Sequence, residues 1–255
     1  MHSLRIAAAQ SISVPGDISA NVRIHTQFIA AAQHAGVDLL VFPELSLSGY
    51  EPALLPGCVL HPGDARLTPL QNLARQARMA IVVGAPIAAP DALRPYIGAI
   101  SFFPDGSHSV YCKKHLHASE ESFATPGDPA GDNHFAVHGT PLALAICADA
   151  MHAPHAERAA AAGASLYIAS SVVSVGGYAA EVAQLRQHTR QFGMGVLMAN
   201  QGGTTGGYVC AGQSGFWAPG GDLVVAAPGT GPVLVVAEYG AQGWSGAVHA
   251  VALPP

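Results

Sequence analysis

The sequence predicts an α/β protein with mixed β-sheets, and two observations lead to this class. Strand-like apolar runs alternate with helix-like segments along the whole chain, which is typical of helices layered on sheets. Pro104-Asp105-Gly106 is a turn sequence between two strand-like runs, so it predicts a hairpin. Because a hairpin is antiparallel, we expect mixed sheets and not purely parallel ones.

Apolar patterning places the elements of the first half of the chain. The run Leu39 to Phe42 is apolar throughout, which indicates a strand buried on both faces. Val22, Phe28 and Ile29 are apolar positions of the first helical segment. The expected strands are Leu4 to Ala9, Leu39 to Phe42, Ile81 to Val83, Ile97 to Phe103 and Ser109 to Lys113, and the expected helices are Ile18 to Ala35 and Leu67 to Met79.

The second half begins with a polar loop that runs from Lys113 to Asp128, and loops of this length are often functional. The strands expected after it are Leu142 to Ile146, Leu166 to Ala169, Val196 to Ala199, Leu223 to Ala226 and Val233 to Val236, with helices at Pro154 to Ala162 and Ala179 to Phe192. No internal repeat and no clear linker interrupts the pattern. We therefore expect one domain over residues 1–255.

Composition narrows the possible partners. Charged residues make up 11% of the chain against about 25% in an average protein. Since 50% of residues are hydrophobic, either the core is large or subunits bury a face, and we expect a homodimer or a higher homo-oligomer. The formal charge of -5 and the lack of any Lys/Arg run argue against nucleic acid or an anionic membrane as partner. A small-molecule substrate fits better.

The sequence also predicts the location of the protein and the state of its cysteines. No stretch approaches the roughly 18 apolar residues of a membrane span, and the start of the sequence lacks the pattern of a secretory signal. The expected location is cytoplasmic. The four cysteines lack metal-type spacing, so we expect free thiols.

Three reactive residue types stand at predicted strand ends. Cys147 closes an apolar run that begins at Pro141, and Glu44 and Lys113 also come directly after strand-like runs. A thiolate is a nucleophile, a poorly solvated carboxylate is a base, and an ammonium group stabilises an oxyanion. Taken singly, each has a plain structural explanation: a buried thiol, a helix N-terminal carboxylate and a solvated lysine. Together they predict covalent acyl transfer.

The segments around these residues resemble the three signatures of the nitrilase (carbon-nitrogen hydrolase) superfamily. They are Phe42-Pro43-Glu44-Leu45 with Gly49-Tyr50, then Tyr111-x-Lys113-x-His115-Leu116, then Cys147-x-Asp149. The similarity extends from Ile6-Ala7-Ala8-Ala9-Gln10 through Ala199-Asn200 and Gly212-Gln213-Ser214 to Pro219-Gly220. The order and separation of the signatures also agree with the family, and the match covers nearly the whole chain.

The resemblance implies a four-layer α-β-β-α sandwich with two mixed β-sheets flanked by helices, which often dimerises. It also implies that Glu44 is the base, that Lys113 and the backbone N–H of Ala148 stabilise the oxyanion, and that Cys147 is the nucleophile. The family has a second glutamate six residues before the Pro of a Pro-Gly pair. Counting back from Pro126 gives Glu120, with Glu121 as the alternative.

The substrate pocket is less well defined by the sequence. We expect its binding residues to include Ala148, Tyr50, Glu51, His152 and Asn200. The histidine pairs 115/117 and 152/155 could bring imidazoles together, but nothing beside them completes a zinc motif. Neither glycine pair forms a phosphate-binding loop. No metal and no organic cofactor is therefore expected.

The residues after the nucleophile indicate the reaction. Cys147-Ala148-Asp149 resembles the Cys-x-Asp of amidases and carbamoyl hydrolases, whereas true nitrilases carry Cys-Trp-Glu. We therefore expect cleavage of a small linear amide or N-carbamoyl amine, as in omega-amidases, aliphatic amidases or N-carbamoyl amidases. Acyl transfer to an amine, nitrile hydrolysis and a non-catalytic scaffold are the alternatives. Ala148 replaces a bulkier family residue, and the segment from Cys147 to Pro154 is one residue longer than usual.

Overall fold

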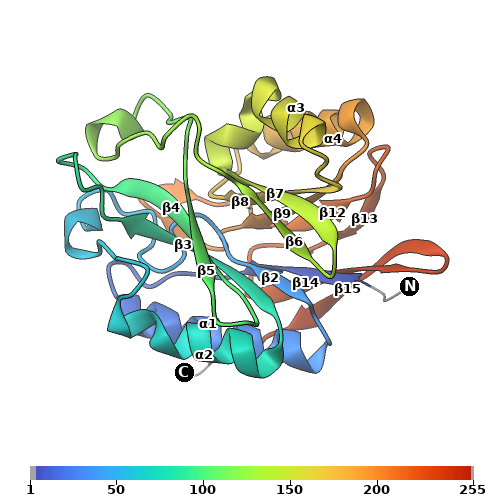
Figure 1. Cartoon of the computed structure of the whole chain (residues 1–255), viewed down its shortest axis with the longest axis horizontal. Helices are drawn as coiled ribbons and strands as arrows, with labels where there is room; N and C mark the ends of the chain where they lie inside the picture. Colours follow the sequence, from blue (N-terminus) through green and yellow to red (C-terminus); the bar gives the residue numbers. More distant parts are fainter. Residues whose placement is uncertain (1–3, 254–255) are drawn as a thin grey trace.

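The computed structural model, which describes residues 4–253, contains two β-sheets stacked face to face with helices on both outer sides (Figure 1). The first sheet has seven strands in the order β15 (Gly243–Ala250), β14 (Val233–Gly240), β1 (Leu4–Gln10), β2 (Leu39–Val41), β3 (Ala80–Ile87), β4 (Tyr96–Phe102) and β5 (His108–Cys112). The second has six in the order β13 (Leu223–Ala226), β12 (Gly215–Trp217), β9 (Gly195–Asn200), β8 (Leu166–Ser171), β7 (Thr140–Ile146) and β6 (His134–Val137). A separate small hairpin joins β10 (Thr204–Thr205) to β11 (Tyr208–Val209).

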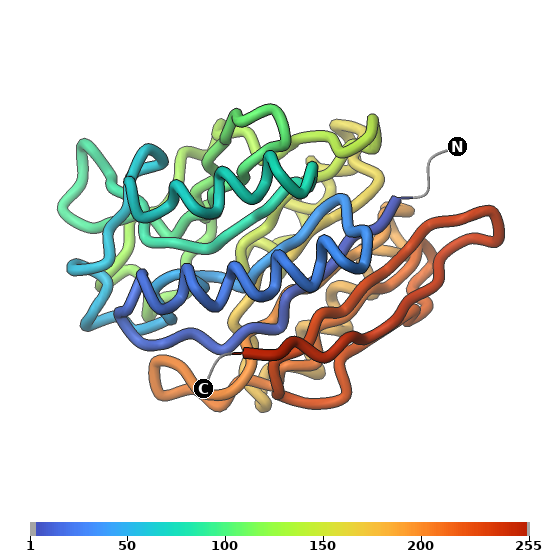
Figure 2. The backbone as a smooth tube through the Cα atoms, turned by 90° about the horizontal axis from the view of Figure 1, so that it is seen from below, coloured from blue at the N-terminus to red at the C-terminus, as the bar shows by residue number. Residues whose placement is uncertain are grey.

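The helices complete four layers. The pair α1 (Ile18–His34) and α2 (Thr68–Ala77) lies side by side on the seven-stranded sheet (Figure 2). The pair α3 (Ala153–Ala161) and α4 (Tyr178–Phe192) covers the six-stranded sheet (Figure 1). Four short 3-10 helices, η1 (Leu55–Gly57), η2 (Ala65–Leu67), η3 (Glu120–Ser122) and η4 (Cys147–Met151), lie in the connections. The α-β-β-α sandwich implied by the family resemblance is therefore confirmed.

Both sheets are mixed, as the predicted hairpin requires. β4 and β5 pair antiparallel, whereas β1, β2 and β3 run parallel at the centre of their sheet. In the other sheet β7, β8 and β9 run parallel. Residues that follow the carboxyl ends of these central strands therefore gather at the same edge of each sheet. Since the two sheets face each other, one site can draw residues from both.

The core has three apolar layers, one between the sheets and one under each helix pair. Side chains alternate along the strands, so Val41 packs between the sheets while Leu40 packs against α1 and α2. Burial on both faces explains why the run that begins at Leu39 is apolar throughout. Each such aliphatic side chain contributes about 1.5–3 kcal/mol of burial free energy.

Every strand and helix expected from the sequence is present, with ends shifted by a few residues. The expectations omitted β6, β10, β11, β12 and β15. Three of these have only two or three residues, too few for a periodic pattern. β15 is longer, but it is glycine-containing and largely exposed, so its sequence lacks a strong strand pattern.

Two further expectations can be compared with the described part of the chain. All four cysteines, Cys58, Cys112, Cys147 and Cys210, are free thiols. Across residues 4–253, no helix is both long and apolar enough to cross a membrane.

Candidate active site

Cys147 lies where β7 passes into η4. Its φ is +45°, a left-handed conformation that is uncommon for a residue with a side chain and typically costs about 1–3 kcal/mol. The turn is held from within, because the Asp149 carboxylate accepts a hydrogen bond from the backbone N–H of Ile146 at 3.2 Å. The thiol is buried yet lines a cavity. Strain at this position presents the sulfur at the strand end.

Glu44 is positioned by a similarly tight turn after β2. The next residue, Leu45, has φ of +51°, and the turn packs directly on Gly84 of β3. A Cβ at Gly84 would lie 2.4 Å from both Leu45 N and Pro43 O, so only glycine allows this approach. Ser46 Oγ accepts the N–H of Gly84 at 3.1 Å and ties the turn to the sheet.

Lys113 follows β5 and joins two carboxylates. Its Nζ donates to Glu44 Oε1 and to Glu120 Oε1, each at 2.7 Å, and all three side chains are fully buried. Glu120 begins η3, and its Oε2 accepts the backbone N–H of His117 at 2.8 Å. Tyr50 donates its hydroxyl to Glu120 Oε1 at 2.9 Å. These short charge-assisted bonds fix a Glu44-Lys113-Glu120 cluster.

The structure also distinguishes the two glutamates that compete for the second position. Glu120 is buried and bonds to Lys113, whereas Glu121 is exposed. The spacing to the Pro-Gly pair therefore selects the residue that reaches the cluster.

Burial and neighbouring charges set the protonation states of Glu44, Lys113 and Cys147. Burial raises the pKa of Glu44 to about 7, with the charge of Lys113 opposing this and the charge of Glu120 adding to it. Burial alone would lower the pKa of Lys113, but the charge of Glu44 raises it above its ordinary value. Burial and the charge of Glu44 raise the pKa of Cys147 well above its ordinary value. The thiol is therefore protonated at rest and needs a base.

Glu44 is arranged to be that base. Its Oε1 accepts a hydrogen bond from Lys113, whereas its buried Oε2 has no hydrogen-bond partner among residues 4–253. The nearby Cys147 thiol is among the groups that lower the pKa of Glu44. With a pKa near neutrality, Glu44 can both accept and return a proton.

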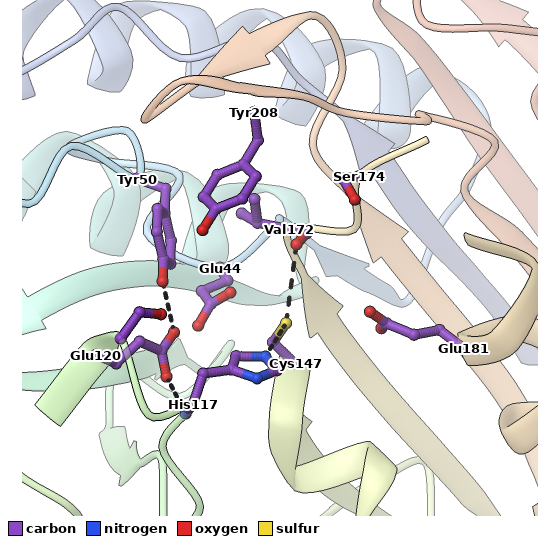
Figure 3. A pocket seen from close by; sticks show the side chains of 10 residues that line it. Glu44, Tyr50, His117, Glu120, Cys147, Val172, Ser174, Glu181 and Tyr208 are labelled. Atoms are coloured by element: carbon purple, nitrogen blue, oxygen red, sulfur yellow. Dashed lines mark hydrogen bonds between the residues drawn. The ribbon is translucent and has the colours of Figure 1, made fainter. Parts of the chain in front are cut away.

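These side chains meet at a cavity of about 220 Å³ (Figure 3). Lys113 contributes no surface to it but holds two carboxyl groups that do. The lining residues are Glu44, Tyr50, His117, Ser119, Glu120, Cys147, Val172, Ser174, Glu181 and Tyr208. A site of this size accommodates a small molecule.

The structure brings together some of the residues expected in the pocket. Tyr50 lines the cavity, and Ala148 is buried next to Cys147 in η4. Ala148 and the three other expected residues do not line the cavity. Glu51 Oε1 instead accepts from Gly206 N at 2.8 Å and so fastens the hairpin of β10 and β11. Asn200 and His152 also contact other residues.

Asn200 and His152 both contact structural partners. The buried Asn200 Oδ1 accepts the N–H of Val173 at 2.7 Å, and so holds the segment that follows β8. His152 is exposed and stacks on His115 with ring centroids 4.0 Å apart. Within residues 4–253, neither these histidines nor any other group of three His, Cys, Asp or Glu side chains is arranged to hold a metal ion.

Several lining residues were not expected from the sequence. Val172 and Ser174 follow β8, which runs parallel to the strand of Cys147, so the shared strand edge is the signal that could have identified them. Glu181 and Tyr208 reach the cavity from α4 and β11, for which no local pattern is informative. His117 Nε2 lies 3.8 Å from Cys147 Sγ.

Asp149 connects the turn of Cys147 to the segment that carries Lys113. Its carboxylate accepts the Tyr111 hydroxyl at 2.7 Å and the backbone N–H groups of Lys114 and His115 at 3.1 and 2.9 Å. These donors belong to the segment that carries Lys113, whereas Asp149 itself belongs to the turn of Cys147. Asp149 Oδ1 also accepts a hydrogen bond from the His115 ring at Nδ1, at 2.9 Å.

The chain is similar in sequence to a known enzyme family and in structure to a known amidase. The profile of the family described as "Carbon-nitrogen hydrolase" matches residues 5–243. An amidase from Nesterenkonia sp. AN1 superposes with a TM-score of 0.83 at 26% identity, covering 98% of this chain and 93% of that chain. A variant of that enzyme, solved with acrylamide added to its active-site cysteine, superposes with a TM-score of 0.83 at 25% identity, with the same coverage of both chains.

Two curated relatives are also similar in sequence. An (R)-stereoselective amidase from Pseudomonas sp is 32% identical over 162 residues, which cover 62% of this chain and 56% of the amidase. A glutamine-dependent NAD(+) synthetase from Xanthomonas campestris pv. campestris (strain 8004) is 31% identical over 211 residues, which cover 78% of this chain. The match spans only 37% of the length of the synthetase.

Proposed function

The chain belongs to the carbon-nitrogen hydrolase family, and we propose that it hydrolyses a small linear amide or N-carbamoyl amine through a thioester on Cys147. The observation that carries the proposal is the arrangement of a protonated thiol beside the Glu44-Lys113-Glu120 cluster at one small cavity. Likeness to amidases supports amide chemistry over nitrile chemistry. Omega-amidase, aliphatic amidase and N-carbamoyl amidase activities all fall within this class.

In the acylation step, Glu44 accepts the thiol proton while the sulfur of Cys147 forms a bond to the carbonyl carbon. The carbonyl oxygen becomes an oxyanion. Lys113 has three N–H donors, of which two are used by carboxylates, so the third can bind this oxygen. The backbone N–H of Ala148 is the second donor, and one such donor is typically worth about 3–4 kcal/mol.

Collapse of the intermediate then breaks the C–N bond. Glu44 returns its proton to the nitrogen, which departs as ammonia or an amine, and the acyl group remains on Cys147 as a thioester. In the second half-reaction Glu44 removes a proton from water, which attacks the thioester carbon and releases the acid and the thiol. One carboxylate thus serves both half-reactions, and the overall reaction consumes only water.

The test is an ammonia-release assay on a panel of aliphatic amides, N-carbamoyl amines and nitriles. We expect turnover of amides or carbamoyl compounds by the wild type and none by Cys147→Ala. Cys112→Ala is the matched control, because Cys112 does not line the cavity. Full activity of Cys147→Ala would overturn the proposal. Turnover that requires an added amine acceptor would indicate acyl transfer, and binding without turnover would indicate a scaffold.

We also propose that the protein acts in the cytoplasm as a homodimer or higher homo-oligomer. The low charged fraction of 11% motivates this, as does the exposure of Leu223, Tyr239 and Val248 on strands β13 to β15. Sedimentation at micromolar concentration should give at least twice the chain mass. A monomer alone would contradict the oligomer, and recovery outside the cytosolic fraction would contradict the location.

A further inference from the structure

The mechanism leaves one carboxyl group of the cavity unused. Glu181 lies in the first turn of α4 and lines the cavity together with Cys147. Figure 3 shows its carboxylate turned toward Cys147 from the side opposite Glu44 and Glu120. A negative charge near a helix N-terminus is favourable by itself, but that effect explains a glutamate facing solvent equally well. It does not explain one that faces a catalytic cavity.

Within the described part of the chain, Glu181 also lacks a partner for its charge. Among residues 4–253, none forms a salt bridge or a hydrogen bond with its carboxylate, in contrast to Glu44 and Glu120, which share Lys113. Burial raises the pKa of Glu181 to about 7, with the charge of Lys113 opposing this. A partly buried carboxylate without a partner is costly, and a cationic ligand would remove that cost.

The charges around the cavity also favour a cationic ligand. Among residues 4–253, three carboxyl groups line it, and no Lys or Arg side chain does. The one ammonium group in contact with the site, that of Lys113, is already bonded to two carboxylates. An anionic group on the substrate would meet Glu181 without a counter-charge, whereas a cationic group would be attracted. The Ser174 hydroxyl and the Tyr208 ring also line this cavity and can accommodate an ammonium group.

We propose that Glu181 selects substrates that carry an ammonium group a few carbon atoms from the scissile carbonyl. The inference rests on the proposed hydrolase function and narrows its substrate class. Two kinds of compound share this chemistry. In an amino-terminated alkanamide the ammonium group belongs to the acyl chain, and in an N-carbamoyl diamine it belongs to the leaving amine. A cavity of about 220 Å³ restricts either one to a short chain.

The experiment compares each cationic substrate with an isostere in which a methyl group replaces the ammonium group. The pairs are γ-aminobutyramide with valeramide, and N-carbamoyl-propanediamine with butylurea. We expect kcat/KM to favour the cationic member of at least one pair by roughly 10- to 100-fold, as for one charge-assisted contact. The pair that shows the preference identifies whether the cation lies on the acyl or the amine side.

Glu181→Gln should bring the kcat/KM ratio of that pair close to one, since the amide retains the shape but not the charge. Glu157→Gln is the matched control, because Glu157 is exposed on α3 and does not line the cavity. The control should keep the wild-type ratio. Equal or faster turnover of the methyl members by the wild type would overturn this inference and leave the hydrolase function intact.

A binding measurement keeps the inference testable if turnover is absent. Calorimetry on Cys147→Ala should show tighter binding of the cationic member, and the preference should vanish in the double variant with Glu181→Gln. No turnover of any compound together with such a preference would overturn the proposed function alone. No turnover and no Glu181-dependent preference would overturn both.

Discussion

The two sides of the catalytic cavity are built differently. On one side, Lys113 joins Glu44 and Glu120 through hydrogen bonds of 2.7 Å, and all three side chains are fully buried. On the other side, the Cys147 sulfur has only loose polar contacts, 3.8 Å to His117 Nε2 and 3.9 Å to Val172 O. Glu181, beside it, has no partner among the described residues. The first side is fixed before substrate arrives, and the second is left open for the substrate to complete.

In the proposed mechanism, this difference separates the group that stabilises the oxyanion from the group that attacks. A preorganised charged cluster can stabilise a developing oxyanion without having to rearrange during the reaction. A nucleophile needs the opposite, since a sulfur engaged in strong contacts would not attack. The strained φ of +45° at Cys147 presents the thiol, and Glu44 lines the same cavity with its Oε2 unpaired among the described residues.

The largest loss of activity and stability is expected from Lys113→Met. Loss of the ammonium group leaves Glu44 and Glu120 buried without a counter-charge and removes an oxyanion donor. We expect kcat/KM to fall by about 1000-fold or more, and the free energy of unfolding to fall by about 3–5 kcal/mol. Turnover and urea unfolding measure the two effects.

Lys114→Met is the control for this substitution. Lys114 is the next residue, but its Nζ donates to Pro129 O and Gly131 O and not to the cluster. We expect its activity to stay within a few-fold of wild type. Comparable loss in both variants would contradict the special role of Lys113.

A smaller loss of activity is expected from Asp149→Asn, because Asp149 connects the segment of Lys113 to the turn of Cys147. An amide nitrogen would face donors such as the Tyr111 hydroxyl and the N–H of His115, so at least one buried bond is lost. We expect kcat/KM to fall by roughly 10- to 100-fold. Alkylation of Cys147 by iodoacetamide should slow as well, because the turn that presents the thiol is disturbed. Tyr111→Phe removes a single donor and should have a weaker effect on both readouts.

The smallest effect is a displacement of the pH profile. Because burial raises the pKa of Glu44 to about 7, the base is lost as pH falls, and kcat/KM should rise with pH through about 7. An ordinary glutamate would give this limb near its usual pKa of about 4.3. The charge of Glu120 raises the pKa of Glu44, so Glu120→Gln should move the limb to lower pH. An unmoved limb would show that another group titrates.

The fixed side of the cavity was easier to predict from the sequence than the open side. Glu44 follows a buried apolar strand, as Cys147 does on the open side, and Lys113 follows the edge strand β5. The order and spacing of the family motifs also give Glu120. Strand burial leaves a clear pattern in sequence because every residue of a central strand must be apolar. The four-layer arrangement, however, was implied only by family resemblance, since periodicity does not tell which sheets pack together.

The open side depends on contacts between segments that are distant in the chain. Glu181 reaches the cavity from a helix, and Tyr208 reaches it from a hairpin of two-residue strands, so neither carries a local signature. Glu51 was expected among the substrate-binding residues, but its carboxylate accepts hydrogen bonds from Thr205 and Gly206. Residue type and nearness to a motif do not fix which way a loop side chain turns.

The central claim is that the fixed cluster drives acyl transfer to the open thiol. Intact-mass spectrometry of the protein during turnover of an amide or carbamoyl substrate tests it most directly. We predict a mass increase equal to the acyl group, located on Cys147 by peptide mapping and absent from Cys147→Ala, with ammonia released in parallel. Ammonia release with no adduct on Cys147, or from Cys147→Ala at the wild-type rate, would contradict the account.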